Sequence, residues 1–284
     1  MANKSDWSGD LGATWAEQAE VMERLLAPFG DKAMTGLGDI AGQRVLDLGC
    51  GGGATTLTLA RQVGSGGAAL GVDVSPDLIA LAARRREAAK GAARQAGFLE
   101  ADAATAPLAG PFDALYSQFG AMFFDAPIPA FINLRKAMRP EGRLSIACWQ
   151  VPKKNGWAML ALNAAKPVLP PMPPADPTAP GPFAWADPDK TFKRILDAAG
   201  WKKITYEPFE TTLALGQGMD GDPLEAAVTF SMKIGPLASR LGDVSAKVTA
   251  EVECRVRDVM AAQPRTKDGA VAVPGAAWIV SAVA

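Results

Sequence analysis

The hydrophobic positions between residues 41 and 150 follow two alternating patterns. Short apolar runs, typical of buried strands, are separated by stretches in which apolar residues recur every three or four positions, as in amphipathic helices. The runs predict strands at 44–48, 68–74, 97–102, 112–119 and 143–149, and helices that begin at Ala54 and Pro76 or cover 130–138. Alternation of this kind predicts a parallel sheet with helices on both faces.

The flanking segments have other patterns. Apolar residues at three- and four-residue steps over 15–29 predict a helical leader, residues 1–40, before the core at 41–150. Residues 151–200 contain a proline-rich stretch that cannot enter a sheet, then a helix that Asp187 and Pro188 would cap. A strand is expected over 201–216, helical segments over 217–270 and a final strand over 271–284.

The amino-acid composition excludes several classes of catalytic and binding function. The 284 residues include no histidine, which excludes Ser-His-Asp and Cys-His nucleophile pairs and the zinc-protease helix. The net charge of −1 gives no general reason to bind nucleic acid or a membrane surface. Cys50, Cys148 and Cys254 are far apart and odd in number, which favours a reduced, cytoplasmic protein. Neither a signal peptide nor a membrane span is expected.

The stretch from Asp47 to Gly53, DLGCGGG, joins the first strand to the helix that begins at Ala54. Glycines let the backbone approach a ligand closely, and the helix presents its N–H groups to the same space. A plain tight turn would explain the glycines alone. A dinucleotide site is a further alternative, because Gly49, Gly51 and Ala54 fit G-x-G-x-x-G/A, but an acid just before the turn and a long leader weigh against it.

Two more acids follow predicted strands. Asp73 ends the second strand, where a carboxylate can accept hydrogen bonds from ribose hydroxyls, although a capping turn with Ser75 would also explain it. Asp102 ends the third strand. Ligands of open parallel sheets lie over these strand ends, so three acids with a glycine turn predict a binding site.

In this order, the motifs resemble those of class I S-adenosylmethionine-dependent methyltransferases. VLDLGCGGGATTLTLA, GVDVSPDLIALAARR and FLEADAATAPL are similar to the first three motifs of the family, and FDALYSQFGAMFFDAP with LRKAMRPEGRLSIACW is similar to the fourth and fifth strands of its ubiquinone-biosynthesis-like subgroup (methyltransferase domain 11/25 type). The resemblance implies an α/β, Rossmann-like, doubly wound seven-stranded sheet of order 3-2-1-4-5-7-6, mostly parallel with an antiparallel last strand. A helical N-terminal lid and an inserted helical and proline-rich cap are expected in addition.

The resemblance implies S-adenosylmethionine as the cofactor. The glycine turn would lie against its methionine part near Asp47, Asp73 would hold the ribose, and Asp102 with Ala103 would flank the adenine. The full expected set is Trp15, Asp47, Gly49, Cys50, Gly51, Gly53, Thr55, Thr56, Asp73, Val74, Leu78, Asp102, Ala103, Gln118 and Phe119. Trp15 would cover the cofactor from the lid, or alternatively serve as a core residue of a docked helix.

The acceptor is expected to be a small hydrophobic or aromatic molecule, because large apolar residues fall in loop-like segments. The candidates are Met122, Phe123, Trp149, Phe183, Trp185 and Phe230. Ordinary core packing would explain each one singly. Asp125 and Tyr116 are weak candidates for a base, as Asp125 could cap the next helix and Tyr116 lies within a strand. Methyl transfer by proximity and desolvation needs no dedicated base.

Other functions fit less well. The scattered cysteines do not favour arsenic methylation, and without a carboxylate cluster metal-assisted transfer is weak. Arg84, Arg85 and Arg86 are most simply a solvated helix face, so no nucleic-acid partner is expected. A non-catalytic cofactor-binding protein and a nicotinamide-dependent oxidoreductase stay as alternatives. The protein is expected to be a monomer or a homodimer.

Overall fold

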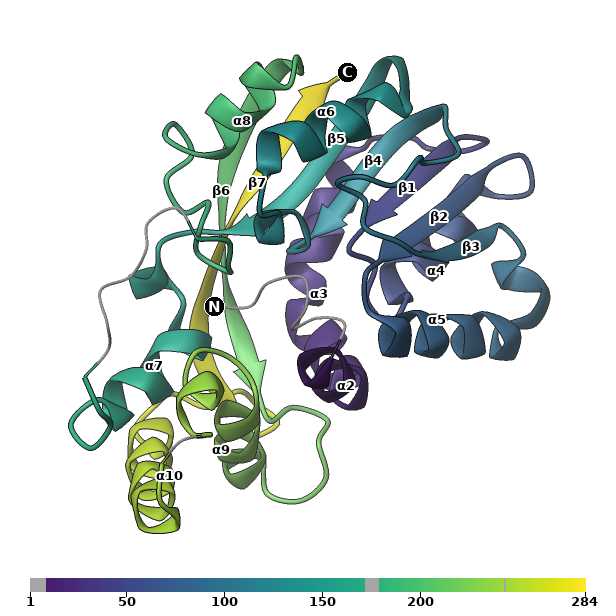
Figure 1. The fold of residues 1–284 in the computed structure, drawn as a ribbon. Helices are drawn as coiled ribbons and strands as arrows, with labels where there is room; N and C mark the ends of the chain where they lie inside the picture. The colour runs from purple at the N-terminus through teal and green to yellow at the C-terminus, as the bar shows by residue number, and fades with distance from the viewer. Residues whose placement is uncertain (1–8, 172–178, 243) are drawn as a thin grey trace. The chain divides into compact units, whose positions relative to one another are not determined.

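The predicted sheet is present in the computed structural model, which describes residues 9–171, 179–242 and 244–284. Its seven strands lie in the order β3-β2-β1-β4-β5-β7-β6 (Figure 1). Strands β1 to β5 pair in parallel, and β7 runs antiparallel to β5, with Ser145 opposite Ser281. The strands are β1 (Arg44–Leu48), β2 (Ala68–Asp73), β3 (Ala96–Glu100), β4 (Phe112–Gln118), β5 (Met138–Trp149), β6 (Lys202–Leu215) and β7 (Val271–Val283). The predicted order and the antiparallel last strand are confirmed.

Helices cover both faces of this sheet (Figure 1). Helices α6 and α8 lie on one face, and α3, α4 and α5 lie on the other. The predicted cap of α5 is confirmed, since the Ser75 hydroxyl accepts a hydrogen bond from the Leu78 N–H and Pro76 opens the helix. The bounds are α2 (Asp10–Glu17), α3 (Ala19–Gly36), α4 (Ala54–Val63), α5 (Pro76–Ala88), α6 (Pro127–Lys136), α7 (Gly156–Ala165), α8 (Phe192–Ala198), α9 (Pro223–Lys233) and α10 (Ala246–Ala261).

The chain divides into two compact units. The first contains residues 1–149, 178–209 and 277–284, and the second contains 150–177 and 210–276. The division falls within β6 and β7, so both strands contribute to both units. The segment expected as a cap, 151–200, is shared between the units, and part of its proline-rich stretch, like the start of the expected lid, lies outside the described residues.

Each unit buries its own core. In the first, β1, β4 and the part of β5 from Leu144 to Trp149 are almost entirely buried, as expected for central strands of a sheet with helices on both faces. In the second, α7 and α9 pack against α10. Helix α10 buries Val252, Val256 and Met260, which lie four residues apart on one face.

Some predicted boundaries were wrong. Helix α8 begins at Phe192 after Thr191, because the Asp187 carboxylate instead accepts a hydrogen bond from the Lys190 N–H in a preceding turn. Strand β3 ends at Glu100, so Asp102 lies in the following loop. Helix α7 was not predicted. It is apolar on most of its circumference, which removes the periodic polar face that identifies a helix in sequence.

Among the described residues, no helix is long and apolar enough to cross a membrane.

Candidate functional site

The glycine turn leaves β1 at Leu48 and is fixed to the neighbouring strand. The N–H groups of Gly49 and Cys50 both donate to the carbonyl oxygen of Val72 in β2, at 2.9 and 3.2 Å. Gly51 has a φ of 53°, a left-handed conformation that favours glycine, and a Cβ added there would have no atom within 4 Å. The turn therefore presents bare backbone to open space at Gly51.

Asp47 lies beneath this turn and is 1% exposed. Its Oδ2 accepts hydrogen bonds from the hydroxyls of Thr55 (2.7 Å) and Thr56 (2.6 Å), at the start of α4. Its Oδ1 has no hydrogen-bond partner among the described residues. Burial raises the pKa of the Asp47 carboxyl to about 6, despite the two hydroxyl bonds. An unsatisfied buried carboxylate oxygen beside an open turn is a ready acceptor for a cationic or N–H-bearing ligand.

Asp73 joins the end of β2 to the same turn. Its Oδ2 accepts from the Gly51 N–H at 2.9 Å, and its Oδ1 accepts from the Ser75 N–H at 3.0 Å. Each carboxylate oxygen retains a second lone pair, so these bonds leave room for ligand hydroxyls. Val74, which follows Asp73, is half-buried, and Leu78 is buried in the first turn of α5. Asp73 thus both shapes the turn and remains able to accept further bonds.

The loop after β3 is held by a residue that the sequence did not indicate. Asn133 of α6 donates through Nδ2 to the carbonyl oxygens of Ala103 (3.0 Å) and Ala106 (2.9 Å). Within the loop, Asp102 Oδ1 accepts from the Ala104 N–H at 3.0 Å. Asn133 is distant in sequence and has an ordinary helical neighbourhood, so only the fold reveals this contact.

The end of β4 is tied to the N-terminal helices. Gln118 donates through Nε2 to the Leu26 carbonyl of α3 at 2.8 Å. Phe119, with a φ of 60°, stacks on Trp149 with ring centroids 3.8 Å apart, and Phe29 of α3 meets both rings edge-on. The predicted candidates Gln118, Phe119 and Trp149 are therefore brought together at the ends of β4 and β5. Trp15, on α2, is half-buried.

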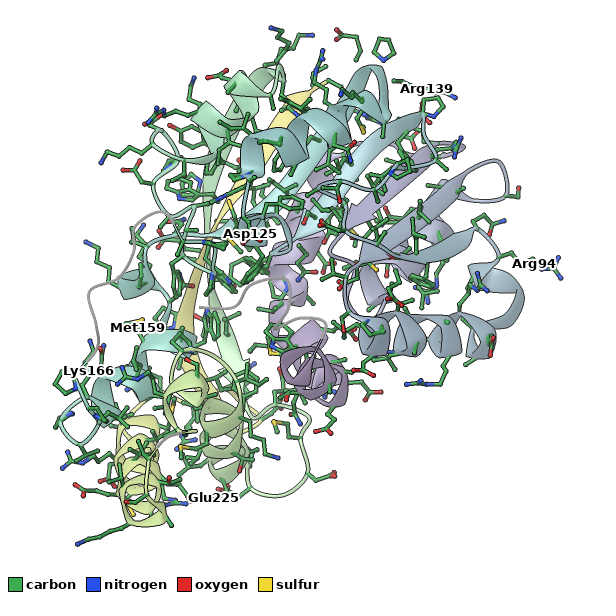
Figure 2. The ribbon with its side chains drawn as sticks, viewed as in Figure 1. Arg94, Asp125, Arg139, Met159, Lys166 and Glu225 are labelled. Atoms are coloured by element: carbon green, nitrogen blue, oxygen red, sulfur yellow. The ribbon has the colours of Figure 1, made fainter. Side chains whose placement is uncertain are left out.

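Three predicted residues have no obvious chemical role. Burial raises the pKa of the Cys50 thiol well above its usual value, which disfavours a thiolate at this position. Tyr116 is fully buried, and its pKa is likewise raised by burial, which disfavours a tyrosinate base. Asp125 is exposed (Figure 2), and α6 is capped by Ala126 without a side-chain bond. Gly53 makes the last turn before α4 with a φ of 82°.

The expected acceptor residues divide between the units. Met122 and Trp149 touch through a Trp149 N–H to Met122 Sδ contact of 3.4 Å in the first unit. Trp185 is buried against Phe131 of α6. Phe230 is buried in α9 of the second unit, whereas Phe123 and Phe183 are half-buried in the first.

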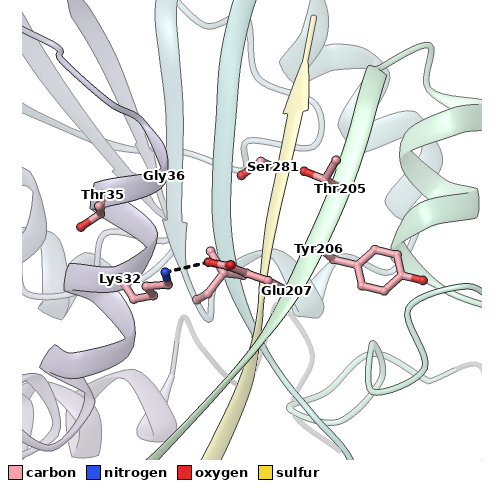
Figure 3. A pocket seen from close by; sticks show the side chains of 8 residues that line it. Lys32, Thr35, Gly36, Thr205, Tyr206, Glu207 and Ser281 are labelled. Atoms are coloured by element: carbon pink, nitrogen blue, oxygen red, sulfur yellow. Dashed lines mark ion pairs between the residues drawn. The ribbon is translucent and has the colours of Figure 1, made fainter.

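A hollow of about 370 Å³ lies elsewhere in the first unit, between α3 and strands β6 and β7 (Figure 3). Lys32 and Glu207 form an ion pair of 2.8 Å across it. Hydroxyl groups of Thr35, Thr205 and Ser281 also line it. None of the predicted cofactor residues is among its lining residues, so we do not assign it to the strand-end site. The described residues also contain no cluster of three or more His, Cys, Asp or Glu side chains suited to a metal.

Comparison with known proteins identifies the region that carries this site. The family model of the methyltransferase domain matches residues 45–142. That range begins in β1, ends in β5 and includes the glycine turn and all three acids. Residues 45–142 are similar to the methyltransferase domain.

The chain is also similar to curated proteins over about half of its length. An uncharacterized protein of Mycobacterium tuberculosis is 31% identical over 159 residues, 55% of this chain and 56% of its own length. The aklanonic acid methyltransferase DauC of a Streptomyces species is 30% identical over 119 residues, 42% of this chain and 53% of its own. The chain thus spans about half the length of these curated relatives. The solved structure of Bacillus subtilis YcgJ shares the fold, with a TM-score of 0.53 at 15% identity over 90% of this chain and 97% of its own.

One prediction, about the three consecutive arginines of α5, was wrong. Arg85 does not belong to a solvated face like its exposed neighbours Arg84 and Arg86. Its side chain is 20% exposed and reaches the glycine turn, where Nη1 donates to the Gly52 carbonyl oxygen at 2.8 Å. The sequence gives no sign of this, because three consecutive arginines on a helix look alike until their neighbours are known.

Proposed function

We propose that the chain is an S-adenosylmethionine-dependent methyltransferase that binds its cofactor over the ends of β1 and β2. The observation that carries the proposal is the unsatisfied Asp47 Oδ1, buried beside the open backbone of Gly51. The methionine part of the cofactor carries an ammonium group, which is the complement of a buried carboxylate oxygen without a donor. The residues present therefore fit this cofactor.

Asp73 and Asp102 would each contact a different part of the cofactor. Asp73 would accept from the ribose hydroxyls with the lone pairs that Gly51 and Ser75 leave free. Asp102 and Ala103 would border the adenine, in a loop that Asn133 holds in place. Gln118 and Phe119 would close the pocket from the end of β4.

When bound, the cofactor supplies an electrophilic methyl group on a positively charged sulfur. The chain's own task is to align an acceptor in line with the carbon–sulfur bond and to exclude water, and alignment alone is worth up to about 7–11 kcal/mol. The exposure of Asp125 and the raised pKa of Tyr116 support transfer without a dedicated base.

A small hydrophobic or aromatic acceptor is the class we favour. The buried aromatic group of Phe29, Phe119 and Trp149 at the ends of β4 and β5 supports it, because these rings make the surroundings of the strand ends apolar. The relative DauC is named for a methyl acceptor, aklanonic acid, which is a small molecule. The ubiquinone-biosynthesis-like subgroup, the cytoplasmic location, the absence of a nucleic-acid partner and the monomeric or homodimeric state stay predictions.

Isothermal titration with S-adenosylmethionine and S-adenosylhomocysteine tests the proposal directly. We expect both to bind the wild-type chain and the control Asp77→Asn, whose side chain is exposed on α5, and to bind Asp73→Ala at least about tenfold more weakly. Absence of binding at tens of micromolar would reject the cofactor. Label transfer from methyl-labelled cofactor into a metabolite extract then separates an enzyme from a protein that only binds the cofactor.

A further inference from the structure

The carbonyl oxygen of Gly52, in the middle of the glycine turn, faces the side chain of Arg85 from α5. Arg85 Nη1 donates to this oxygen at 2.8 Å and to Glu23 Oε1 of α3 at 2.6 Å. One guanidinium nitrogen thus joins three segments of the first unit: the turn, α5 and α3. These segments are 33 and 62 residues from Arg85 in sequence, so the contact is tertiary.

We propose that Arg85 and Glu23 form a latch that holds the N-terminal helix α3 against the glycine turn and so positions the turn for its ligand. Arg85 is a positioning residue in this proposal, and its effect on the cofactor rests on the function proposed above. An exposed pair would contribute little, but the side chains of Arg85 and Glu23 are only 20% and 30% exposed.

The turn is held from two sides. A Cβ added to Gly52 would lie 2.7 Å from Arg85 Nη1, 2.9 Å from Leu81 Cδ2 and 3.1 Å from Glu23 Oε1. At Gly51, an added Cβ would meet nothing within 4 Å, and the Gly51 N–H is fixed by Asp73. One side of the turn is therefore packed against the latch, while the next residue is open to a ligand.

A second contact between the N-terminal helices and α5 supports a docked position for the segment. Helix α2 packs along α5, the helix that carries Arg85. Burial also raises the pKa of Glu23 even though Arg85 lowers it, so the carboxylate is largely withdrawn from water. A guanidinium is suited to this position because it can bind two acceptors through rigid, planar N–H groups, whereas an ammonium is a more strongly hydrated point charge.

The test compares Arg85→Ala and Glu23→Gln with Arg84→Ala, whose side chain is exposed on the same helix. Amide hydrogen exchange is measured first, without ligand, for residues 49–54 and 19–30, because it reports local opening segment by segment. We expect Arg85→Ala to raise exchange in both segments. Glu23→Gln should raise it mainly in 19–30, because Arg85 would still donate its hydrogen bond to the Gly52 carbonyl oxygen. Arg84→Ala should match the wild type.

Affinity for S-adenosylhomocysteine is measured second. Arg85→Ala should weaken binding about tenfold, and the double variant with Glu23→Gln should be no weaker than Arg85→Ala alone, as expected for two residues that act together. Arg85→Lys should recover part of the affinity, and it replaces Arg85→Ala if that variant does not fold.

The latch is rejected if Arg85→Ala exchanges like Arg84→Ala in both segments, or if exchange rises equally throughout the sheet. Hydrogen exchange of the ligand-free protein tests the latch independently of the proposed function. If the wild type does not bind S-adenosylhomocysteine, the proposed function fails, but the exchange result still decides whether the latch exists. If the wild type binds and Arg85→Ala binds equally well, the positioning role fails and the function stands.

Discussion

Two consecutive glycines, Gly51 and Gly52, are needed for opposite reasons. A side chain at Gly52 would displace the ends of the Arg85, Leu81 and Glu23 side chains, which already surround the position. Gly51 has ample room, but its φ of 53° is unfavourable for other residues and its open side is where we place the ligand. The motif GCGGG therefore combines a packing requirement with a binding requirement, which its letters alone do not distinguish.

Substitution of Gly51 by alanine separates backbone strain from ligand approach. Gly42 is a matched control, since it also has a positive φ, of 72°, and nothing within 4 Å of an added Cβ. Both Gly51→Ala and Gly42→Ala should lose about 1–2 kcal/mol of unfolding free energy to the left-handed conformation. Only Gly51→Ala should also lose affinity for S-adenosylhomocysteine, by at least about tenfold, in a titration. Equal affinities of the two variants would show that no ligand approaches Gly51.

The chemistry at residue scale was predictable where it depends on local order in the chain. Asp47 and Asp73 lie at the ends of β1 and β2, and Asp102 comes shortly after β3. The carboxyl ends of parallel strands meet at one edge of a sheet, so the sequence was enough to place these acids at the same edge. Arg85 and Asn133 were not predictable, because their partners lie 33 and 30 residues away and neither belongs to a motif. Hydrogen bonds of this kind depend on how helices dock, which periodicity does not specify.

At the scale of elements, α6 reaches across to the loop that follows β3. The two bonds from Asn133 Nδ2 to Ala103 and Ala106 fix the segment next to Asp102. Asn133→Ala should lower the unfolding free energy by about 1 kcal/mol and weaken S-adenosylhomocysteine binding about tenfold, since the loop would lose its anchor. Lys136→Ala, an exposed change on the same helix, should alter neither quantity. Titration and urea unfolding measure both, and unchanged affinity in Asn133→Ala would contradict the role of the loop.

A second asparagine joins elements of the second unit. Asn155 precedes α7 and is fully buried; its Oδ1 accepts from the Ala276 N–H at 3.0 Å. Its Nδ2 donates to the carbonyl oxygens of Ala276 and Gln150, at 3.2 and 3.3 Å. Asn155→Ala would remove the acceptor of the Ala276 N–H, whereas the Ala276 carbonyl oxygen would keep its bond from the Gln150 N–H at 3.0 Å, so the change should cost about 1–3 kcal/mol in urea unfolding. Asn163→Ala, exposed on α7, should cost little, and similar losses in both variants would refute this account.

The elements themselves were predictable to different degrees. Strands β1 to β5 follow from their apolar runs, and α5 follows from its serine cap and proline. Strand β5 begins at Met138, before the run predicted at 143–149, because the exposed residues Arg139, Pro140 and Glu141 separate Met138 from that apolar run. Helix α7 lacks a polar face, and α8 begins after a turn that uses the residue expected to cap it. Elements of this kind are fixed by tertiary contacts, which the hydrophobic pattern of the sequence does not show.

At the scale of the whole molecule, the carboxyl groups with a shifted pKa fall into two classes. Burial raises the pKa of Glu23, Asp47 and Asp73, all at or beside the glycine turn. Exposed partners lower the pKa of Asp187 and Glu225, through Lys190 and Arg257 respectively. In a protein with a net charge of −1, the buried negative charge is thus concentrated where the ligand is proposed to carry a positive one.

This distribution predicts an unusual dependence of stability on pH. The pKa of Asp47 is about 6 when folded, against an ordinary value of 3.8, so the folded state binds this proton more tightly than the unfolded state. Its contribution to stability is therefore fully present below about pH 4 and is lost as the pH rises through about 6. Other carboxyls oppose this trend, and Asp47→Asn isolates it because both proteins share every other titrating group. Urea unfolding of the ligand-free proteins should show the wild type losing stability relative to Asp47→Asn between about pH 4 and 7, with a constant difference above that range. A difference that stays constant from pH 4 to 7, or that rises, would mean that Asp47 keeps its charge without cost and that its Oδ1 already has a partner.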